Sequence, residues 1–222
     1  TVRLPDAQWP KICAFLQQQE GIPLGKASAC RQFVETVLWI LRSGAPWRLL
    51  PAENGRWNSV YRRFRRWGRY RIGEKMLAFF SDGADVKTLM GDRTIMRAHA
   101  CAAGAPAAGQ ALPPNQALGR SRGGFSTKIH LLVNGLGKPL RALLTPGQAA
   151  DSPQVPLLFD RFAPSVAILD KAYDTDAVLA FFESQGAIPV IPPKANRVVQ
   201  RDYDRPLYKE RNRIGNYLPY LS

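Results

Sequence analysis

The chain has 222 residues, of which 45% are hydrophobic, so it is long and apolar enough to bury a core. This composition excludes an intrinsically disordered chain. Lysine and arginine outnumber aspartate and glutamate by 31 to 17, which gives a net charge of +14 at pH 7. Such a surplus is typical of proteins that bind a polyanion, most often a nucleic acid, although ribosomal and membrane-surface proteins share it.

The cysteines and the hydropathy pattern point to a reducing compartment. Cys13, Cys30 and Cys101 are scattered and form no CxxC pair, which argues against a zinc finger. The sequence holds no secretory signal and no apolar run near 18 residues. We therefore expect a cytoplasmic protein that has no membrane partner.

The element pattern predicts two domains, a helical one over residues 1–88 and a mixed α/β one over residues 89–222. Basic residues exceed acidic ones in both, by 15 to 7 in the first and by 16 to 10 in the second. Each domain can therefore contact a polyanion.

Three stretches of the first domain have the apolar spacing of short helices. Asp6 can cap the first helix and Ser28 the second, which Gly44 and Pro46 end. Asn58 or Ser59 opens the third. Three short helices of which the last is basic resemble a helix-turn-helix module.

The third helix carries the most concentrated positive charge of the chain. Seven arginines and no acid lie between Arg56 and Arg71. Val60, Phe64 and Trp67 share one face, so the arginines cover the rest of the helix surface. The sequence predicts that this surface contacts DNA phosphates or enters a groove. The predicted contact residues are Arg62, Arg63, Arg65 and Arg66. The alternative is a charged face that contacts only water.

The second domain alternates predicted strands and helices. The strands cover residues 89–96, 125–134, 138–145, 166–169 and 188–191, and the helices residues 153–162 and 176–185. Asn134-Gly135 marks a hairpin between the second strand and the third. The glycine-rich segment 119–124 adds Arg120 and Arg122 on a backbone that can approach a phosphate closely, or it is a simple flexible turn.

Two aspartates are the candidate catalytic residues. Asp92 lies on the first predicted strand, and Asp170 ends the apolar run of residues 166–169. A carboxylate beside a buried strand is costly unless it is paired or binds a metal. Two such groups brought together can hold one or two divalent cations for cleavage of a phosphodiester. The alternative for each is a helix cap or a structural ion pair, and spacing alone does not show that they meet.

Motifs along nearly the whole chain resemble the DDE transposases of bacterial insertion sequences, in the group conventionally numbered five. The matching blocks are SGAPWR at 43–48, YRRF at 61–64, DRT at 92–94, RAH at 97–99, LGRSRGG at 118–124, TKIH at 127–130, LDKAYD at 169–174 and IPP at 191–193. Each block is weak alone, but the order and spacing of all of them are specific.

The resemblance implies an RNase H-like catalytic domain behind a helical DNA-binding domain. In the family three carboxylates bind Mg²⁺, with Mn²⁺ as a substitute, for DNA strand cleavage and strand transfer at terminal inverted repeats. Asp92 and Asp170 match the first two. The implied partners are double-stranded DNA, as terminal repeats and as target, and further copies of the chain on DNA at the nucleoid. Lys128, Tyr208 and Arg211 are expected to contact DNA near the site.

The third carboxylate is missing from the matching position. The family's closing motif reads Tyr-x-x-Arg-x-x-x-Glu, and here Tyr208 and Arg211 are followed by Gly215. Glu210 lies five residues earlier, which turns its side chain roughly 140° away on a helix. We therefore expect a transposase that is truncated or frameshifted before its third acidic residue, with an incomplete catalytic domain and weak or no activity. The alternatives are a DNA-binding remnant that represses intact transposase and a metal-dependent nuclease of host origin.

Overall fold

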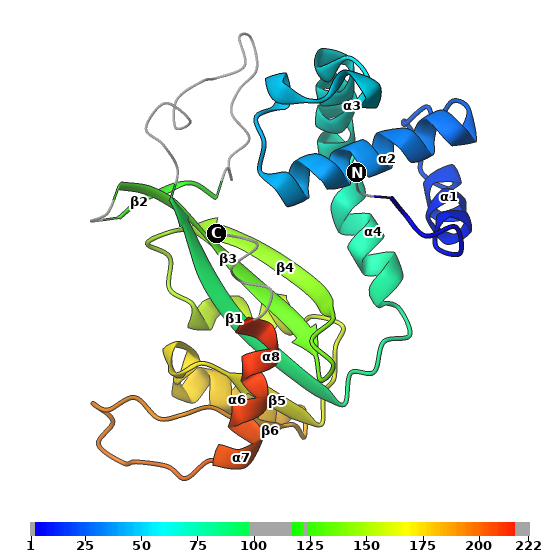
Figure 1. Cartoon of the computed structure of the whole chain (residues 1–222). Coiled ribbons are helices and arrows are strands. Elements are labelled where there is room, and N and C mark those ends of the chain that lie inside the picture. Colours follow the sequence, from blue (N-terminus) through cyan, green and yellow to red (C-terminus); the bar gives the residue numbers. More distant parts are fainter. Residues whose placement is uncertain (1–2, 98–116, 122–123, 216–222) are drawn as a thin grey trace. The chain divides into compact units, whose positions relative to one another are not determined.

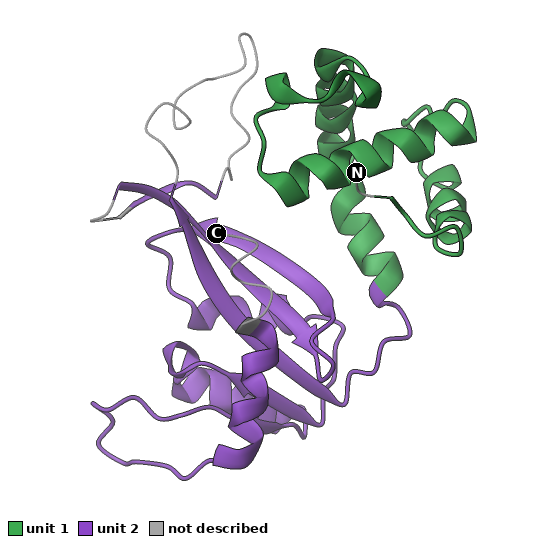
Figure 2. Cartoon of the chain, viewed as in Figure 1, with its two compact units in different colours: residues 1–80 green, residues 81–222 purple. Residues whose placement is uncertain are grey.

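The computed structural model describes residues 3–97, 117–121 and 124–215 (Figure 1). It divides into two compact units, residues 1–80 and 81–222 (Figure 2). The structure divides after residue 80, whereas the sequence analysis placed the boundary after residue 88. The carbonyl oxygen of Lys87 accepts hydrogen bonds from the backbone nitrogens of Ser165 and Val166, so this segment already belongs to the second unit.

The first unit consists of helices around one core. The α-helices are α1 (Trp9–Gln17), α2 (Ala27–Ser43), α3 (Trp57–Arg69) and α4 (Ile72–Ser81). Their apolar faces meet at buried Phe15, Leu16, Phe33, Trp67 and Ile72. The predicted helical domain is confirmed.

All three predicted helix starts were wrong by one or more residues. Helix α3 begins at Trp57, before both Asn58 and Ser59. The residue before α1 is Gln8, and Asp6 instead forms an ion pair with Arg31 at 2.7 Å. Helix α2 begins one residue before Ser28, after Lys26 in an extended conformation. The predicted end of α2 was right, because Gly44 adopts the left-handed conformation (φ 65°) that a glycine tolerates best.

The second unit is built on a six-stranded mixed sheet. The strands are β1 (Thr88–Arg97), β2 (Gly119–Ser121), β3 (Gly124–Asn134), β4 (Pro139–Pro146), β5 (Val166–Leu169) and β6 (Ile188–Val190). Their order is β2-β3-β1-β5-β6, and β4 also pairs with β3. The predicted hairpin at Asn134-Gly135 joins β3 to β4. Strand β2 stands where the sequence suggested a flexible turn.

Strand direction changes at the middle of the sheet. Strand β1 pairs with β3 in the antiparallel sense and with β5 in the parallel sense, and β6 extends the parallel part. This mixed sheet after an N-terminal helical unit confirms the predicted fold class. The carboxyl end of β5 therefore lies beside Gly91, where the parallel pairing with β1 ends and β1 continues to Arg97.

Helices cover both faces of the sheet (Figure 1). Helices α5 (Val155–Phe159) and α6 (Asp176–Ser184) pack on one face, against Leu89, Leu132 and Leu169. Helix α5 is shorter than the predicted 153–162, because a 3-10 turn precedes it.

The opposite face takes the last described segment. It consists of α7 (Arg205–Tyr208), the 3-10 helix η6 (Lys209–Arg211) and α8 (Asn212–Gly215). Ile214 is fully buried there against Met90, Ile168 and Val190. The short C-terminal segment thus covers apolar sheet surface.

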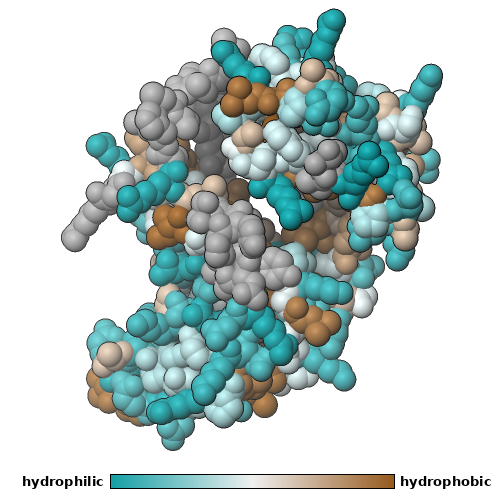
Figure 3. Space-filling view, viewed as in Figure 1, coloured by the Kyte–Doolittle hydropathy of each residue, from teal (hydrophilic) through white to brown (hydrophobic). Residues whose placement is uncertain are grey.

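The exposed hydrophobic side chains do not form one patch on the visible face. Figure 3 shows small hydrophobic groups separated by hydrophilic residues. Val198 and Val199 are among the exposed hydrophobic residues, and both lie in the segment between β6 and α7. Among the described residues, no helix is long and apolar enough to cross a membrane.

Candidate active site

The register of the sheet brings Asp92 and Asp170 together. Gly91 is paired with Leu169 in the parallel ladder of β1 and β5, and each aspartate is the next residue of its chain. The two carboxylates therefore lie at neighbouring positions at the carboxyl end of the parallel pair. The sequence placed each residue correctly on or beside a strand, and the tertiary pairing supplies the proximity.

Both carboxylates belong to the face that the C-terminal helical segment covers. Side chains alternate along a strand, so Asp92 shares a face with Met90, and Asp170 continues the face of Ile168. Met90 and Ile168 pack against Ile214. The site is therefore bounded by the sheet edge and by the segment that carries Tyr208 and Arg211.

Asp92 is nearly buried and bonded to two groups. Its Oδ1 atom accepts a hydrogen bond from the backbone nitrogen of Arg93 at 2.8 Å. Its Oδ2 atom accepts one from Nη1 of Arg211 at 2.6 Å, as part of an ion pair. Arg211 was predicted to contact DNA, and here its guanidinium neutralises the first carboxylate.

The electrostatics of the site favour an added positive charge. Burial raises the pKa of Asp92 above its ordinary value, and the negative charge of Asp170 raises it further. The positive charge of Arg211 and the hydrogen bond from Arg93 lower that pKa but do not restore it. A second cation at this edge would therefore stabilise the ionised form of Asp92.

Asp170 is held at the start of the 3-10 helix η5 (Lys171–Tyr173). Its Oδ1 atom accepts a hydrogen bond from the backbone nitrogen of Lys171 at 2.7 Å. This is the helix-cap alternative of the sequence analysis, and it coexists with the placement beside Asp92. Capping fixes the carboxylate while the residue stays only half-buried, so it remains open to a ligand.

Two carboxylates suit a hard divalent cation, because carboxylate oxygens are the ligands that Mg²⁺ prefers. Mg²⁺ is often bound by one or two carboxylates together with substrate phosphates. Residues 3–97, 117–121 and 124–215 contain no cluster of three His, Cys, Asp or Glu side chains that could hold a metal. Among the described residues, Asp92 and Asp170 are therefore the candidate donors.

In the described structure neither Glu210 nor Asp204 takes the place of the third carboxylate that the family resemblance implies. Glu210 forms an ion pair with Nη2 of Arg213 at 2.5 Å, which agrees with the predicted turn away from the site. Asp204 caps α7 through a 2.8 Å hydrogen bond from the backbone nitrogen of Leu207. Position 215 follows Arg211 by four residues, about one helical turn, so a side chain there would lie on the same side of the segment.

A buried carboxylate anchors the loop behind the site. Asp174 accepts hydrogen bonds from the backbone nitrogen of Lys194, Nε of Arg197 and Nη2 of Arg201, at 2.6 to 2.8 Å. Burial raises the pKa of Asp174, but these bonds outweigh it and hold the pKa below its ordinary value. The network ties residues 194–201 to η5, which Asp170 caps. Sequence reasoning assigned Asp174 no role of its own, and its only signal was the LDKAYD block.

A second buried network supports η5 from the other side. His130 is fully buried, with Nδ1 3.0 Å from the hydroxyl of Tyr173 and Nε2 2.9 Å from the hydroxyl of Thr145. Burial lowers the pKa of His130, so the imidazole is neutral at pH 7. The sequence analysis did not include His130 among the candidate ligands, and the structure places it in a structural network.

Lys128 is nearly buried and already paired, and its predicted DNA contact stays a prediction. Its Nζ atom donates to the carbonyl oxygen of Ala149 at 2.6 Å and pairs with Oδ1 of Asp151 at 2.8 Å. Its side chain is only 10% exposed. Asp151 also pairs with Nε of Arg93 at 2.7 Å, so it joins two of the motif blocks. The sequence carried no signal for the role of Asp151.

Of the other predicted contact residues of the second unit, Tyr208 and Arg211 lie together. Tyr208 is half-buried, and its ring packs edge-on against Tyr203 with centroids 5.6 Å apart. The guanidinium of Arg211 lies 5.4 Å from the Tyr208 ring. Arg120 is exposed on β2, and Arg122 lies outside the described residues.

The arginines of α3 divide between two environments. Arg62, Arg65 and Arg66 are exposed on the helix surface. Arg63 turns inward, where its Nη2 atom donates to the carbonyl oxygen of Leu24 at 3.2 Å. Within the described residues none of these four arginines forms a salt bridge. The DNA role of all four stays a prediction, and the inward position of Arg63 makes a direct contact harder for it than for the others.

Two family profiles match the chain. The family described as "Putative transposase of IS4/5 family" matches residues 4–77. The family described as "Transposase DDE domain" matches residues 92–220, which is more than half of the chain.

Curated relatives from two bacteria match about half of the chain. The uncharacterized protein y4sN of Sinorhizobium fredii is 40% identical over 102 residues, which are 46% of this chain and 82% of that protein. A Brucella ovis protein described as "Putative transposase for insertion sequence element IS6501" is 37% identical over 100 residues, which are 44% of this chain and 77% of that protein.

Solved structures with a weaker likeness are transposase complexes. The Mos1 transposase paired-end complex with the left transposon end has a TM-score of 0.30 and 13% identity, covering 84% of this chain and 72% of that chain. The Mos1 strand transfer complex has a TM-score of 0.30 and 14% identity, covering 95% and 79%. A likeness of this degree carries no argument about this chain.

Proposed function

Since the chain belongs to the DDE transposases of bacterial insertion sequences, we propose that its second unit descends from a catalyst of DNA strand cleavage and strand transfer at terminal inverted repeats. Asp92 and Asp170 are the residues that would carry the chemistry. The observation on which this rests is the parallel pairing of Gly91 with Leu169, which makes the two aspartates neighbours.

The family uses a divalent metal ion, and for this chain we propose Mg²⁺, with Mn²⁺ as a substitute. Asp92 and Asp170 would hold the ion, which when bound activates the attacking oxygen and stabilises the leaving oxygen of a phosphodiester. Asp92 must then exchange its ion pair with Arg211 for the new ligand. The freed guanidinium of Arg211 would lie close enough to bind a DNA phosphate.

We further propose that Gly215 leaves this chain impaired. A glycine at the position of the family's glutamate offers no ligand, and Glu210 is engaged with Arg213. Loss of an outer-shell partner alone typically costs about 10–100-fold in metal affinity or activity, and loss of a direct ligand costs at least as much. The sites on DNA would be the element's terminal repeats and a target duplex, bound by more than one copy of the chain. The place of action would be the nucleoid in the cytoplasm.

The test is a gain of function at position 215. Nicking of a supercoiled plasmid that carries the element's ends should rise at least about tenfold for Gly215→Glu over the unchanged chain with Mg²⁺ present. Gly215→Gln is the matched control, because it adds nearly the same volume without the negative charge. Asp170→Asn in the Gly215→Glu background should abolish the gain. Equal nicking by the unchanged chain and Gly215→Glu would refute the impairment.

A second candidate function is favoured by the pairing of Asp92 with Arg211. With one carboxylate neutralised and another replaced by Gly215, the chain keeps the basic helix α3 without a complete metal site. It would then bind terminal repeats and repress intact transposase. The discriminating result is that the unchanged chain inhibits intact transposase in trans and that Asp170→Asn inhibits it equally well.

A further inference from the structure

We propose that the first unit contains a seat for one phosphate of the DNA backbone, in a pocket between α3 and the segment that leads into α2. This proposal rests on the DNA binding proposed above and names the group that is bound. The pocket has a volume of about 440 Å³. Its lining includes Leu24, Ala29, Ser59, Arg62, Arg63 and Arg66.

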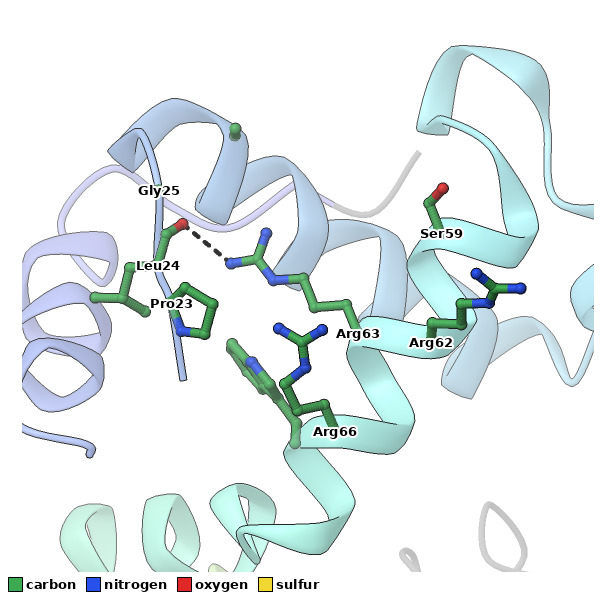
Figure 4. Close-up of a pocket in the computed structure, with 9 residues that line it drawn as sticks. Pro23, Leu24, Gly25, Ser59, Arg62, Arg63 and Arg66 are labelled. Carbon is green, nitrogen blue, oxygen red and sulfur yellow. Dashed lines mark hydrogen bonds between the residues drawn. The ribbon is translucent and has the colours of Figure 1, made fainter. Parts of the chain in front are cut away.

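One stripe of α3 supplies the polar side of the pocket. Ser59, Arg62, Arg63 and Arg66 recur at the spacing of one helix face. In Figure 4, Arg63 and Arg66 extend toward the segment at Leu24, and Ser59 and Arg62 are drawn farther from it. Among the lining residues there are three guanidinium groups and no carboxylate. The concave site therefore concentrates positive charge that nothing in its wall neutralises.

The arginines of the pocket repel one another unless an anion joins them. Arg62 and Arg66 are four residues apart on one helix, an arrangement in which like charges destabilise the helix. Within the described residues neither forms a salt bridge, whereas Arg31 of α2 pairs with both Asp6 and Glu35. An anion bound between Arg62 and Arg66 would remove the repulsion.

Arg63 forms a fixed wall of this site. Besides its bond to Leu24, its Nη2 atom lies 3.3 Å from Sγ of Cys30, and its guanidinium stacks 4.3 Å from the ring centre of Phe33. Its Nε atom is buried and has no hydrogen-bond partner within the described structure. The charge of Arg63 is thus held in place in the pocket that the exposed Arg62 and Arg66 also line, and a bound phosphate could bridge these two.

The chemistry of the wall favours a phosphate that belongs to a polymer. Guanidinium groups bind phosphate oxygens through paired hydrogen bonds, and the hydroxyl of Ser59 can donate one more. The start of α2 adds backbone donors, because Lys26 caps it with no side-chain hydrogen bond. The same helix α3 continues outside the pocket with exposed Arg65 and Arg69. A chain of phosphates could occupy the pocket and this row together.

The first test adds one negative charge inside the pocket or beside it. Ala29 and Ala27 are both exposed in the first turn of α2, but only Ala29 lines the pocket. In the full chain, Ala29→Glu should weaken binding to a duplex of about 30 base pairs by at least about tenfold relative to Ala27→Glu, as expected for the loss of a charge-assisted contact. Ala29→Gln, which differs in charge only, should bind like the unchanged chain. Equal weakening by Ala27→Glu and Ala29→Glu would overturn the proposal.

The second test asks whether Arg62 and Arg66 share one phosphate. The logarithm of affinity falls with the logarithm of salt concentration by about 0.9 for each phosphate neutralised. The double variant Arg62→Gln/Arg66→Gln should therefore lower this slope by about 0.9, the value for one phosphate, whereas two arginines bound to separate phosphates would lower it by about 1.8 when both are replaced. A reduction of about 1.8 for Arg62→Gln/Arg66→Gln would contradict a shared phosphate, even if Ala29→Glu failed to fold.

Titration of the chain with inorganic phosphate separates the two sources of the ligand. Competition between phosphate and duplex that Ala29→Glu abolishes supports the seat. Tight phosphate binding by a chain that binds no duplex would identify a free-phosphate site and overturn the assignment to DNA. If the chain binds neither phosphate nor duplex, the proposed DNA binding itself is refuted. If the chain binds duplex and Ala29→Glu does not weaken that binding, only the phosphate site in the pocket is refuted.

Discussion

Replacing Asp174 by asparagine should destabilise the second unit more than any exposed charge change in the same network. The side chain of Asp174 is fully buried and forms ion pairs with Arg197 and Arg201 at 2.7 and 2.6 Å. Asparagine keeps the shape and one acceptor, but it removes the negative charge between two guanidinium groups. Arg201 then keeps no salt-bridge partner among the described residues, and Arg197 keeps only the exposed Asp176.

The expected magnitude follows from burial. Removing one partner of a buried ion pair costs about 3–5 kcal/mol, because a charge stays behind without compensation. The side chains of Arg197 and Arg201 are 21% and 28% exposed, so water can take over part of the lost interaction. We therefore expect about 3 kcal/mol, the lower end of that range. At roughly 2–4 °C for each kcal/mol in a domain of this size, the midpoint should fall by about 6–12 °C.

Asp176 provides a control on the same arginine. Its Oδ1 atom pairs with Nη1 of Arg197 at 2.8 Å, but its side chain is 89% exposed. Asp176→Asn should leave the midpoint of thermal unfolding unchanged within error, since an exposed pair contributes little. The assay is thermal unfolding of the full chain by circular dichroism, with limited proteolysis of the 194–201 loop as a local readout.

The pH dependence checks the sign of the effect. The pKa of Asp174 lies below its ordinary value, so its stabilisation is present above that value and is lost as pH falls through the folded-state pKa. The difference in unfolding free energy between the unchanged chain and Asp174→Asn should therefore be largest at pH 7 and shrink towards pH 3. Equal stability of Asp174→Asn and Asp176→Asn at pH 7 would refute this reasoning.

Three further perturbations test the packing and charge of the site. Gly91→Ala should lower the free energy of unfolding by about 1–3 kcal/mol, because the added Cβ would overlap Cδ2 of fully buried Leu169. Gly68→Ala should instead stabilise α3, because its Cβ meets nothing within 4 Å. Chemical denaturation measures both changes. Asp92→Asn should raise the midpoint of thermal unfolding at pH 7 and raise it less at pH 4. The folded-state pKa of Asp92 is raised, so the stability that its protonated form gives is lost as pH rises through that pKa. An equal shift of the midpoint at both pH values would contradict this. The unchanged chain should lose stability below pH 6.5, because the lowered pKa of the buried His130 makes the folded state resist protonation. His130→Gln should lose less stability over the same pH range. Parallel stability profiles of the unchanged chain and His130→Gln would count against this.

Elements with a strong local signal could be predicted from the sequence. The hairpin at Asn134-Gly135 and the left-handed end of α2 at Gly44 depend on the backbone preferences of those residues, which act over a few positions. Helix starts were less predictable. Asp6 has the right chemistry for a cap, but its ion pair with Arg31, 25 positions along the chain, took its carboxylate elsewhere.

The sequence could predict which residues form the candidate site, but it could not predict which residues pair with them. The cost of burying a carboxylate beside an apolar strand singled out Asp92 and Asp170. Nothing local indicated that Arg211 would reach Asp92 across 119 positions, or that Lys128 would be occupied by Asp151. Those partners depend on how distant segments pack, because an ion pair forms wherever the fold brings opposite charges within reach.

By itself the sequence determined the family, the order of the elements, the two strand-end aspartates and the glycine at position 215, since each is written in residue type and short-range spacing. Only the tertiary structure decided that Asp92 and Asp170 are neighbours, that both face the C-terminal helical segment, and that Arg63 turns inward while Arg62 and Arg66 stay exposed. The physical reason is that strand register and side-chain burial arise from contacts between segments far apart in the chain. Local preferences do not encode those contacts.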